Sequence, residues 1–517
     1  MADSNSVILA LDSGSQSSRA LLFDPSGRVL ASSGHPHSAM LHPAPGAVEQ
    51  SPADIRDALF ASIRACLQAW GGDPAAIVGA SLTTQRNTLV PAASCGRPLR
   101  DAVSWLDRRT ASVGSEPSKL LRAGLRLLGD QAMVPRLLAK SVPRQWRESQ
   151  PELFEELRWV APLEAWLHHQ LTGVMAMAPG GMAGVLPSDL GGRGWSKSGL
   201  LHKLLGFDRG WLPEIVEAGQ EVGRIHAAAA AATGLTEGLP LYACGGDKQA
   251  EALGAGVRLA EPGVAAVSMG TASSIMLPWA TAKQSARYHW LTLCSAEAGS
   301  WQLEYMVFRG MWTVGWFARN FGGDLKQRAE AEGKPVEALL CAEAEAVPAG
   351  SEGVVVWPRW SPTLQDPSET GAIVGLRETH SRAHLFRALL EGVAFDLRRG
   401  RAILERATGS RIRELRVGGG GARSPLVVQI LADVMNLPVV RPASEELSAR
   451  GAGIVAAAAA GVHRSVGASV AAMVPEAPRY MPDPERVSTY DALYRSVFSR
   501  GGPELSGLNR ALSPFGP

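Results

Sequence analysis

The start of the chain alternates short apolar runs with polar turns. Residues 7–11 are apolar, a polar stretch follows from Asp12, and residues 19–23 are mostly apolar again. Residues 24–27 read Asp-Pro-Ser-Gly, which is typical of a turn, and they lead into a third run over 28–32. We therefore predict that the chain begins with three antiparallel strands.

Helix and strand patterns alternate after this meander. Apolar residues recur at helical spacing over 54–70 and 151–171, and the short apolar run 77–82 is typical of a strand. Further on, 385–406 has the spacing of a long helix and 411–417 is a strand candidate. This alternation predicts the α/β fold class.

The middle of the chain repeats the pattern of its beginning. Residues 241–244 form a short apolar run that ends in Gly245, Gly246 and Asp247, before helical spacing over 248–253. An apolar run, a polar turn and a second run then repeat the opening hairpin over 264–277. We predict two related halves that face one central cleft. The expected division is a domain over 1–254, a domain over 255–485 and a C-terminal tail over 486–517.

Composition agrees with a large globular chain and argues against two classes of partner. The 517 residues exceed the size at which one core stops growing, and 46% of them are hydrophobic. The formal charge of +2 argues against nucleic acid or an anionic membrane as the main partner. The uncharged stretch 262–282 is broken by Gly263, Gly270 and Pro278, so we expect no transmembrane segment.

Cysteine usage and the amino terminus point to one compartment. The five cysteines are widely spaced and contain no C-x-x-C pair, which favours a reducing environment. The first six residues are polar and lack the basic and apolar regions of a signal peptide. We expect a cytoplasmic protein.

Two polar hairpin turns carry candidate phosphate chemistry. The first runs from Asp12 to Arg19, and its glycine, hydroxyls and backbone N–H groups can hold phosphate oxygens while Asp12 holds Mg²⁺ through water. Taken alone, the turn is better explained as an Asp- and Ser-containing hairpin without a ligand. The second turn, 269–273, makes the phosphate interpretation more specific, because two such turns can hold a nucleotide from both sides.

Glycines 418–421 follow a predicted strand and precede a predicted helix. Close backbone approach and a helix N-terminus favour an anion or a flat nucleoside there, although the run also fits a flexible loop. Ser424 is a candidate cap for the following helix, with Pro425 at its first position. A rival motif, Gly451-Ala-Gly453-Ile-Val-Ala, fits a dinucleotide fingerprint but lacks a preceding strand, and the chain contains no P-loop motif.

Asp247 is the candidate general base. It follows a predicted strand and glycine turn, so it lies at a sheet edge where open α/β sheets bind ligands. There it can cap the helix or accept the proton of an attacking hydroxyl. Gln85, Arg86 and Asn87 follow one strand and Trp105 follows another short run, a combination that suits a polyol or sugar. Trp105 also fits a core position.

The ordered motifs resemble the FGGY carbohydrate kinases, the family of glycerol kinase and xylulokinase. The resemblance covers nearly the whole chain. It rests on 12–19, 85–87, 105–110, 245–254, 269–273 and 418–429, together with the carboxy-terminal signature over 371–376 and 384–391.

The resemblance implies two ribonuclease H-like domains of the actin and sugar kinase superfamily, closing on ATP, Mg²⁺ and a small polyhydroxylated substrate. It also assigns expected roles to particular residues. Asp247 is the expected general base, and Asp12 organises Mg²⁺ through water. The expected substrate residues are Gln85, Arg86, Asn87, Trp105, Asp107, Asp247 and Lys248. The expected ATP and phosphate residues are Asp12, Gly14, Ser15, Ser17, Arg19, Gly270, Thr271, Gly419, Gly420 and Ser424. The resemblance leaves a homodimer open.

Two departures from the glycerol kinase pattern leave the substrate open. Asn87 stands where glycerol kinases have a substrate-binding Glu, and Lys248 stands where they usually have Gln. An amide is a weaker acceptor than a carboxylate, and a cation beside the base can lower its pKa or contact phosphates. We expect an ATP-dependent kinase for a ketopentose or for a small polyol such as glycerol or a tetritol. The alternative is a non-catalytic sugar- and ATP-binding regulator or an ATPase of the same superfamily.

Overall fold

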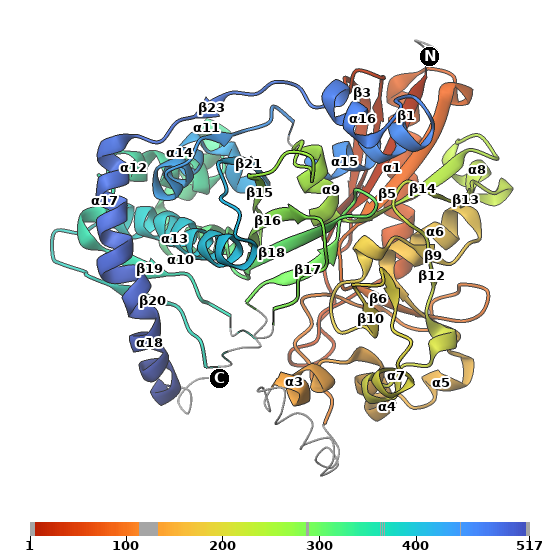
Figure 1. Ribbon diagram of the computed structural model, residues 1–517, viewed down its shortest axis with the longest axis horizontal. Helices are drawn as coiled ribbons and strands as arrows, with labels where there is room; N and C mark the ends of the chain where they lie inside the picture. The colour runs from red at the N-terminus through yellow and green to blue at the C-terminus, as the bar shows by residue number, and fades with distance from the viewer. Residues whose placement is uncertain are drawn as a thin grey trace.

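The computed structural model describes residues 6–512 except 113–132, 286–288, 362, 364, 365, 367 and 445. In this part of the chain, the amino-terminal half lies beside the carboxy-terminal half, and each half is built around a mixed sheet (Figure 1). No helix among the described residues is long and apolar enough to cross a membrane.

The amino-terminal sheet has six strands in the order β13-β14-β5-β1-β2-β3. Its strands are β1 (Val7–Ser13), β2 (Ser17–Phe23), β3 (Val29–Pro36), β5 (Ile77–Thr84), β13 (Glu221–Arg224) and β14 (Pro240–Gly246). The predicted antiparallel meander is confirmed, because β1 pairs with β2 and β2 with β3 in that direction. β5 runs parallel to both β1 and β14. Every residue of β1 is buried, which explains its continuous apolar run.

The carboxy-terminal sheet has seven strands in the order β17-β18-β16-β15-β21-β22-β23. Its strands are β15 (Val264–Met269), β16 (Ser273–Trp279), β17 (Leu291–Cys294), β18 (Trp301–Val307), β21 (Glu414–Gly418), β22 (Val439–Val440) and β23 (Arg479–Tyr480). β15 pairs antiparallel with β16 and parallel with β21. The hairpin and the parallel neighbour therefore repeat the arrangement of β1, β2 and β5.

Smaller sheets complete the structure. A four-stranded sheet contains β4 (Glu49–Gln50), β7 (Ala102–Val103), β6 (Leu89–Ala92) and β8 (Trp159–Pro162). Paired short strands are β9 (Ala176–Met177) with β12 (Glu214–Ile215), β10 (Ser188–Asp189) with β11 (Gly194–Trp195), and β19 (Val355–Trp357) with β20 (Ala372–Val374).

The single helix predicted over 151–171 is wrong. Strand β8 occupies the middle of that stretch and pairs with β6, and helix α6 extends only over Leu163–Thr172. Pro162 lacks a backbone N–H and disfavours helical geometry at the residue before it, so a helix begins after it. Pairing with β6 outweighed the helical spacing of the apolar residues.

Helices α1 (Pro52–Trp70), α6 and α8 (Ala227–Thr233) share one hydrophobic core with the amino-terminal sheet. The other helices of this half are α3 (Met133–Ala139), α4 (Val142–Ser149), α5 (Leu153–Glu156) and α7 (Gly199–Leu205). The helices of the other half are α10 (Trp312–Phe321), α11 (Lys326–Glu332), α12 (Val336–Glu345), α13 (Arg382–Thr408), α14 (Pro425–Met435), α17 (Pro484–Leu493) and α18 (Ser499–Leu512). Helix α13 confirms the long helix predicted over 385–406.

Two helices lie between the main sheets. Helix α9 (Asp247–Gly254) and helix α15 (Leu447–Ala459) pack together, and α15 also contacts β1 and β5 of the amino-terminal sheet. Ala252 of α9 and Leu447 of α15 also pack with Ala266 of β15 in one buried hydrophobic cluster. The chain after 446 therefore crosses back to the amino-terminal half, where α15 and α16 (Val466–Met473) join the core of β1 and β2 (Figure 1).

Glycines allow these two helices to approach closely. A Cβ atom on Gly451 would overlap the carbonyl oxygen of Ala250, and a Cβ atom on Gly254 would overlap that of Leu447. Gly451 lies inside α15 rather than in a turn after a strand. The glycines of the dinucleotide-like motif thus allow close packing of α15, in agreement with the absence of a strand before that motif.

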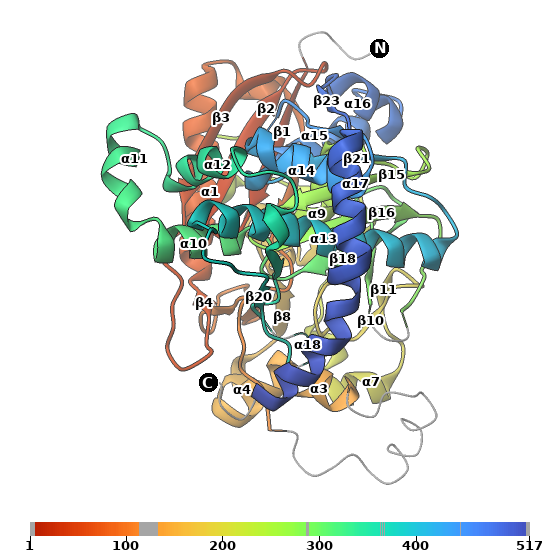
Figure 2. The ribbon, with the colours of Figure 1, turned by 90° about the vertical axis from the view of Figure 1, so that its left-hand side faces the viewer.

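The last residues that the structure describes, 486–512, are helical. From Pro484 onward, α17, the π-helical turn η7 (Tyr494–Phe498) and α18 follow one another along the outside of the carboxy-terminal half (Figure 2). Tyr490 and Phe498 are buried in the same core as α13 and β15. This segment therefore packs as part of the carboxy-terminal half.

Candidate functional site

The first polar turn lies between β1 and β2 and places a carboxylate at the end of a buried strand. Asp12 is 8% exposed, and its Oδ1 atom is buried without a hydrogen-bond partner among the described residues. Burial, followed by the negative charge of Asp247, raises the pKa of Asp12 to about 7. A buried carboxylate with an unused oxygen is suited to a cation or a water-mediated contact.

The second polar turn lies between β15 and β16 and carries no charge. The carbonyl oxygens of Gly270 and Thr271 accept hydrogen bonds from the backbone N–H groups of Met311 and Trp312 at 3.0 and 3.3 Å. Thr271 is exposed. The start of α10 therefore holds the turn from behind while the Thr271 hydroxyl remains accessible.

The glycine run after β21 packs directly on the second turn. Gly419 has φ +83°, and a Cβ atom there would lie 2.8 Å from the backbone carbon of Met269. A Cβ atom on Gly420 would meet nothing within 4 Å. Ser424 occupies the predicted cap position of α14, but its hydroxyl donates to the Sγ atom of Cys341 at 3.6 Å instead of capping the helix. Of these residues, Gly420 therefore presents an open backbone surface.

Asp247 begins α9, directly between the two sheets. Its side chain is 28% exposed, Oδ1 accepts a hydrogen bond from the backbone N–H of Lys248 at 2.8 Å, and the Nε atom of Arg86 lies 3.7 Å from Oδ1. Burial raises the pKa of Asp247, while Lys248 and Arg86 oppose that shift. We call the region bounded by Asp12, Asp247 and Gly270 the interdomain site.

Lys248 connects α9 to the strand that precedes the second turn. Its Nζ atom donates to Glu251 Oε2 at 2.8 Å and to Ser268 Oγ at 2.6 Å, and Ser268 donates to the same carboxylate at 2.8 Å. The Nζ atom also lies 3.7 Å from the position of a Cβ atom on Gly270. Lys248 is therefore adjacent to both the Asp247 carboxylate and the second turn.

Arg86 joins the two halves through an ion pair. Its Nη1 and Nη2 atoms donate to the two oxygens of Glu304 on β18 at 2.8 and 3.1 Å. Glu304 is completely buried, and Arg86 holds the pKa of that carboxyl below its usual range despite burial. Because both Nη atoms are occupied, Nε is the part of Arg86 that faces Asp247.

A polar network connects the first turn to the predicted substrate residues. The Trp105 indole donates to Ser15 Oγ at 2.9 Å, and Ser15 donates to Gln85 Oε1 at 2.8 Å. Gln85 then donates to Gln50 Oε1 at 2.8 Å, and Gln50 Nε2 donates to the Ser15 carbonyl oxygen at 2.9 Å. This closed network fixes the Trp105 indole beside the first turn.

Several predicted residues have other contacts in this structure. Asn87 has φ +57°, and its amide lies where a side chain at Gly184 would be. Asp107 accepts from the backbone N–H of Val48 at 2.9 Å and pairs with Arg109. Arg19 pairs with Glu446, the residue before α15, at 2.7 Å, and its charge also opposes the rise in the pKa of Asp12. Ser17 and Gly14 shape the first turn, where the Gly14 N–H donates to the Ser17 carbonyl at 3.0 Å.

Sequence reasoning missed three side chains of the interdomain site. Glu304 was detectable, because it is a lone carboxylate in the middle of the apolar strand β18. Glu251 and Ser268 gave no such signal, because a Glu in a helix or a Ser in a strand is common and usually has no functional role. Their partnership with Lys248 depends on packing between α9 and β15.

Among the described residues, no group of three or more His, Cys, Asp or Glu side chains is arranged to hold a metal ion. Asp12 stays a predicted contact for Mg²⁺ through water, which does not require such a group because water and phosphate oxygens can supply the other ligands. Its unpartnered oxygen and the neighbouring charge of Asp247 fit a divalent cation.

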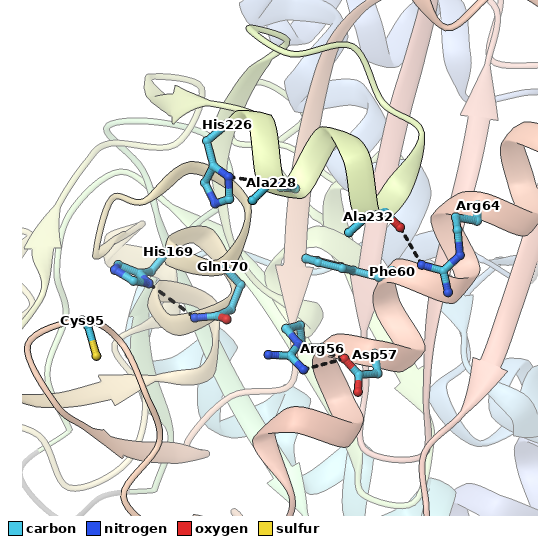
Figure 3. A pocket seen from close by; sticks show the side chains of 11 residues that line it. Arg56, Asp57, Phe60, Arg64, Cys95, His169, Gln170, His226, Ala228 and Ala232 are labelled. Atoms are coloured by element: carbon cyan, nitrogen blue, oxygen red, sulfur yellow. Dashed lines mark hydrogen bonds and ion pairs between the residues drawn. The ribbon is translucent and has the colours of Figure 1, made fainter.

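A separate hollow of about 450 Å³ lies on the amino-terminal half, between α1, α6 and α8 (Figure 3). It contains the Arg56 and Asp57 ion pair, and His226 lies there with its Nδ1 atom accepting from the N–H of Ala229. None of the predicted site residues line this hollow. It is therefore distinct from the interdomain site.

Comparison with known proteins identifies the family. The models of the N-terminal and C-terminal domains of the FGGY family of carbohydrate kinases match residues 7–254 and 265–460. A glycerol kinase of Alkalilimnicola ehrlichii is 30% identical over 512 residues, covering 96% of this chain and 98% of that protein.

Solved structures share the same architecture. The xylulose kinase of Rhodospirillum rubrum is 26% identical with a TM-score of 0.78, covering 98% of this chain and 99% of that one. The glycerol kinase of Plasmodium falciparum, solved with ADP, has the same fold at 18% identity and a TM-score of 0.76, covering 96% of this chain and 98% of that one. Together with the matches to both domain models, this architecture identifies the chain as a carbohydrate kinase. The chain belongs to the FGGY family of carbohydrate kinases, whose members use ATP to phosphorylate sugars or polyols.

Proposed function

We propose that this kinase transfers the γ-phosphate of ATP to a hydroxyl group of a ketopentose or a small polyol, with Asp247 as the general base. The observation that carries this proposal is the position of Asp247. Its carboxylate begins α9 between the two polar turns, with Arg86 and Lys248 as its nearest cations. A general base needs an unprotonated carboxylate within reach of the attacking hydroxyl, and these cations favour the unprotonated form.

In the proposed reaction, the acceptor hydroxyl attacks the γ-phosphorus in line with the leaving ADP oxygen. Asp247 accepts the proton of that hydroxyl as the new O–P bond forms, and the bond between the γ-phosphorus and the bridging oxygen of ADP breaks. The Nε atom of Arg86 lies 3.7 Å from the same carboxylate, so one substrate hydroxyl beside the pair could contact both groups. Closure of the two halves would exclude water and so favour the acceptor over hydrolysis.

The two turns are proposed to hold the triphosphate from opposite sides. On the amino-terminal side, Ser15 and the backbone around Gly14 offer donors, and Asp12 would hold Mg²⁺ through water. Mg²⁺ neutralises phosphate charge in reactions of this kind. On the other side, Gly270 and Thr271 offer backbone and hydroxyl donors, and Gly420 offers an open surface for the adenosine.

The acceptor is proposed from the residues around Trp105 and from the named relatives. The relatives include glycerol kinases and xylulose kinases, which act on a triol and a ketopentose. The Trp105 indole can pack on the carbon face of a sugar or polyol, while Gln85 and Arg86 offer polar groups. Asn87 replaces the carboxylate of the glycerol kinase pattern, and its weaker acceptor suits a hydroxyl or carbonyl arrangement different from that of glycerol, so both acceptor classes are tested.

The test is the rate of ADP release with Mg-ATP and each of xylulose, ribulose, erythritol, glycerol and no acceptor. We expect one acceptor to raise turnover well above the rate without acceptor. Asp247→Asn should lower that stimulated turnover by roughly 10²- to 10⁴-fold without unfolding the protein. Asp57→Asn, an exposed carboxylate on α1, is the matched control and should retain full turnover. A folded Asp247→Asn protein with near-normal turnover would falsify the role of Asp247.

A further inference from the structure

Two arginines from opposite halves of the chain meet on one hydroxyl group. Arg108, which follows β7, donates from Nη2 to Ser361 Oγ at 3.3 Å, and Arg309, between β18 and α10, donates from Nε to the same oxygen at 2.8 Å. The two donor nitrogens are therefore no more than about 6 Å apart. Two guanidinium groups of like charge thus converge where the halves come together.

Neither guanidinium forms an ion pair with any residue that the structure describes. The nearby carboxylates of Asp107 and Glu49 are paired with Arg109 instead. A third cation is close, because Lys140 Nζ donates to the carbonyl oxygen of Arg108 at 2.9 Å. Burial and then the charge of Arg108 lower the pKa of Arg309, in keeping with repulsion between the pair.

Each arginine lies a few residues along the chain from a segment that contacts one of the two polar turns. Arg309 immediately precedes Gly310, Met311 and Trp312, and the last two hold the carbonyls of the second polar turn. On the other half, Arg108 lies three residues after Trp105, whose indole contacts the first polar turn through Ser15. Arg309 also lies 4.8 Å from the centre of the Trp312 ring, which limits where its guanidinium points.

Two guanidinium groups around a hydroxyl form a typical oxyanion site. Guanidinium N–H groups bind carboxylate and phosphate oxygens in charge-assisted hydrogen bonds, and the Ser361 hydroxyl has its own proton available to donate. An anion between the arginines would remove their repulsion. It would also join the two halves of the protein at the edge of the site.

We propose that Arg108, Arg309 and Ser361 bind an oxyanion of a ligand held in the interdomain site and thereby stabilise the closed arrangement of the two halves. This inference rests on the proposed function for the location of the ligands, but it concerns binding rather than transfer. Two sources share this chemistry: the carboxylate of a polyhydroxy acid acting as acceptor, and a phosphate of the nucleotide.

The experiment measures binding without turnover, so that it does not depend on phosphoryl transfer. Arg108→Gln, Arg309→Gln and the double variant are compared with Arg97→Gln, which removes an exposed arginine paired with Glu156. Calorimetry gives the Kd for ADP, and ligand-induced shifts in Tm are recorded for erythronate and xylonate beside the neutral erythritol and xylitol. Arg108 is exposed and Arg309 only partly buried, so the variants are expected to fold.

A carboxylate source predicts that the acids raise the Tm of the wild-type protein more than the neutral polyols do, and that both arginine variants lose this difference. A phosphate source predicts that the Kd for ADP rises by about tenfold in the arginine variants and stays unchanged in Arg97→Gln. In either case the Tm of the ligand-free variants should equal or exceed that of the wild type, because a repulsion is removed. Unchanged ADP binding together with an unchanged response to the acids would overturn the proposal, whether or not the protein proves to be a kinase.

Discussion

The two halves of this protein present the same hairpin at the same place in their sheets, with different chemistry. In the first half, β1 ends near Asp12, which is buried and has an unused oxygen. In the second half, β15 ends at Met269, and the turn that follows offers only backbone groups and the Thr271 hydroxyl. Topology therefore sets where a turn lies, whereas the residue at the strand end sets whether it carries charge.

The strands that follow extend this difference. In the first half, β14 leads directly into Asp247, and β5 leads into Gln85 and Arg86. In the second half, β21 leads into glycines that allow close backbone approach. We infer that the first half carries the reacting groups and the second half carries the nucleotide. Substitutions in the two halves should therefore affect different kinetic constants.

The sharpest test of this contrast removes one polar group at each turn, the carboxylate of Asp12 at the end of β1 and the hydroxyl of Thr271 after β15. Asp12→Asn removes the charge of the first turn, so we expect kcat to fall by roughly 100-fold and the Mg²⁺ concentration needed for activity to rise. Thr271→Ala removes one hydroxyl from the second turn and should change kcat by less than about tenfold. Steady-state kinetics at several Mg²⁺ concentrations measure both. Equal effects of the two substitutions on kcat would contradict the division of roles.

A smaller effect is expected in the glycine run of the second half. Gly419→Ala places a Cβ atom 2.8 Å from the Met269 backbone at a positive φ, so it should displace the second turn. We expect the KM for ATP to rise by about tenfold with little change in the KM for the acceptor. Gly420→Ala is the matched control, because a Cβ atom there meets nothing within 4 Å. The prediction fails if the neighbouring glycine is the more sensitive of the two.

The cations around Asp247 should set the pH dependence of turnover. Lys248 lowers the pKa of Asp247, against the burial that raises it. A general base works in its unprotonated form, so removing Lys248 raises the pKa of the base and moves the acid limb of the pH profile of kcat to higher pH. Lys248→Gln should show this shift and Lys334→Gln, an exposed lysine, should not. A limb that stays in place or moves to lower pH would exclude this role for Lys248.

The smallest expected effect concerns the stability contributed by Glu164, which contacts the glycine turn before Asp247. Glu164 is buried, its Oε1 atom accepts from the N–H groups of Ala178 and Gly245 at 3.1 Å, and burial raises its pKa to about 8. The folded protein therefore binds this proton more tightly than the unfolded chain, so the stabilising contribution is full below about pH 4 and is lost as pH rises to about 8. Glu164→Gln keeps an accepting oxygen without titrating. The decrease in Tm between pH 5 and pH 8 should be smaller in this variant, and an unchanged decrease would contradict the assignment.

Much of the fold was predictable because local signals and tertiary structure agree. The opening meander, β14 with α9, and α13 all follow from apolar runs, turn residues and helical spacing. The helix predicted over 151–171 failed because strand pairing of β8 outweighed helical spacing. The return of α15 to the amino-terminal sheet was also not predictable, because it depends on close packing at Gly254 and Gly451 rather than on a local pattern.

The candidate site was predictable only in part. Asp247 was singled out because it follows a predicted strand and a glycine turn, and Asp12 because it ends an apolar run before a polar turn. Taken alone, each residue also fits a structural role, and only the ordered set of motifs favoured the functional one. The ion pair of Arg86 with Glu304 joins residues 218 positions apart, and the contact of Lys248 with Ser268 joins residues on α9 and β15. Such pairs form only when the two halves come together, so no single segment of the sequence predicts them.

The most direct test of the account is the fate of the γ-phosphate. Phosphorus NMR or mass spectrometry of a reaction with Mg-ATP and the stimulating acceptor would measure phosphorylated acceptor, inorganic phosphate and ADP together. Transfer of the γ-phosphate to the acceptor predicts one phosphorylated acceptor for each ADP, with little inorganic phosphate. Asp247→Asn should form neither ADP nor phosphorylated acceptor. ADP matched by inorganic phosphate, with no phosphorylated acceptor, would contradict it and identify an ATPase instead.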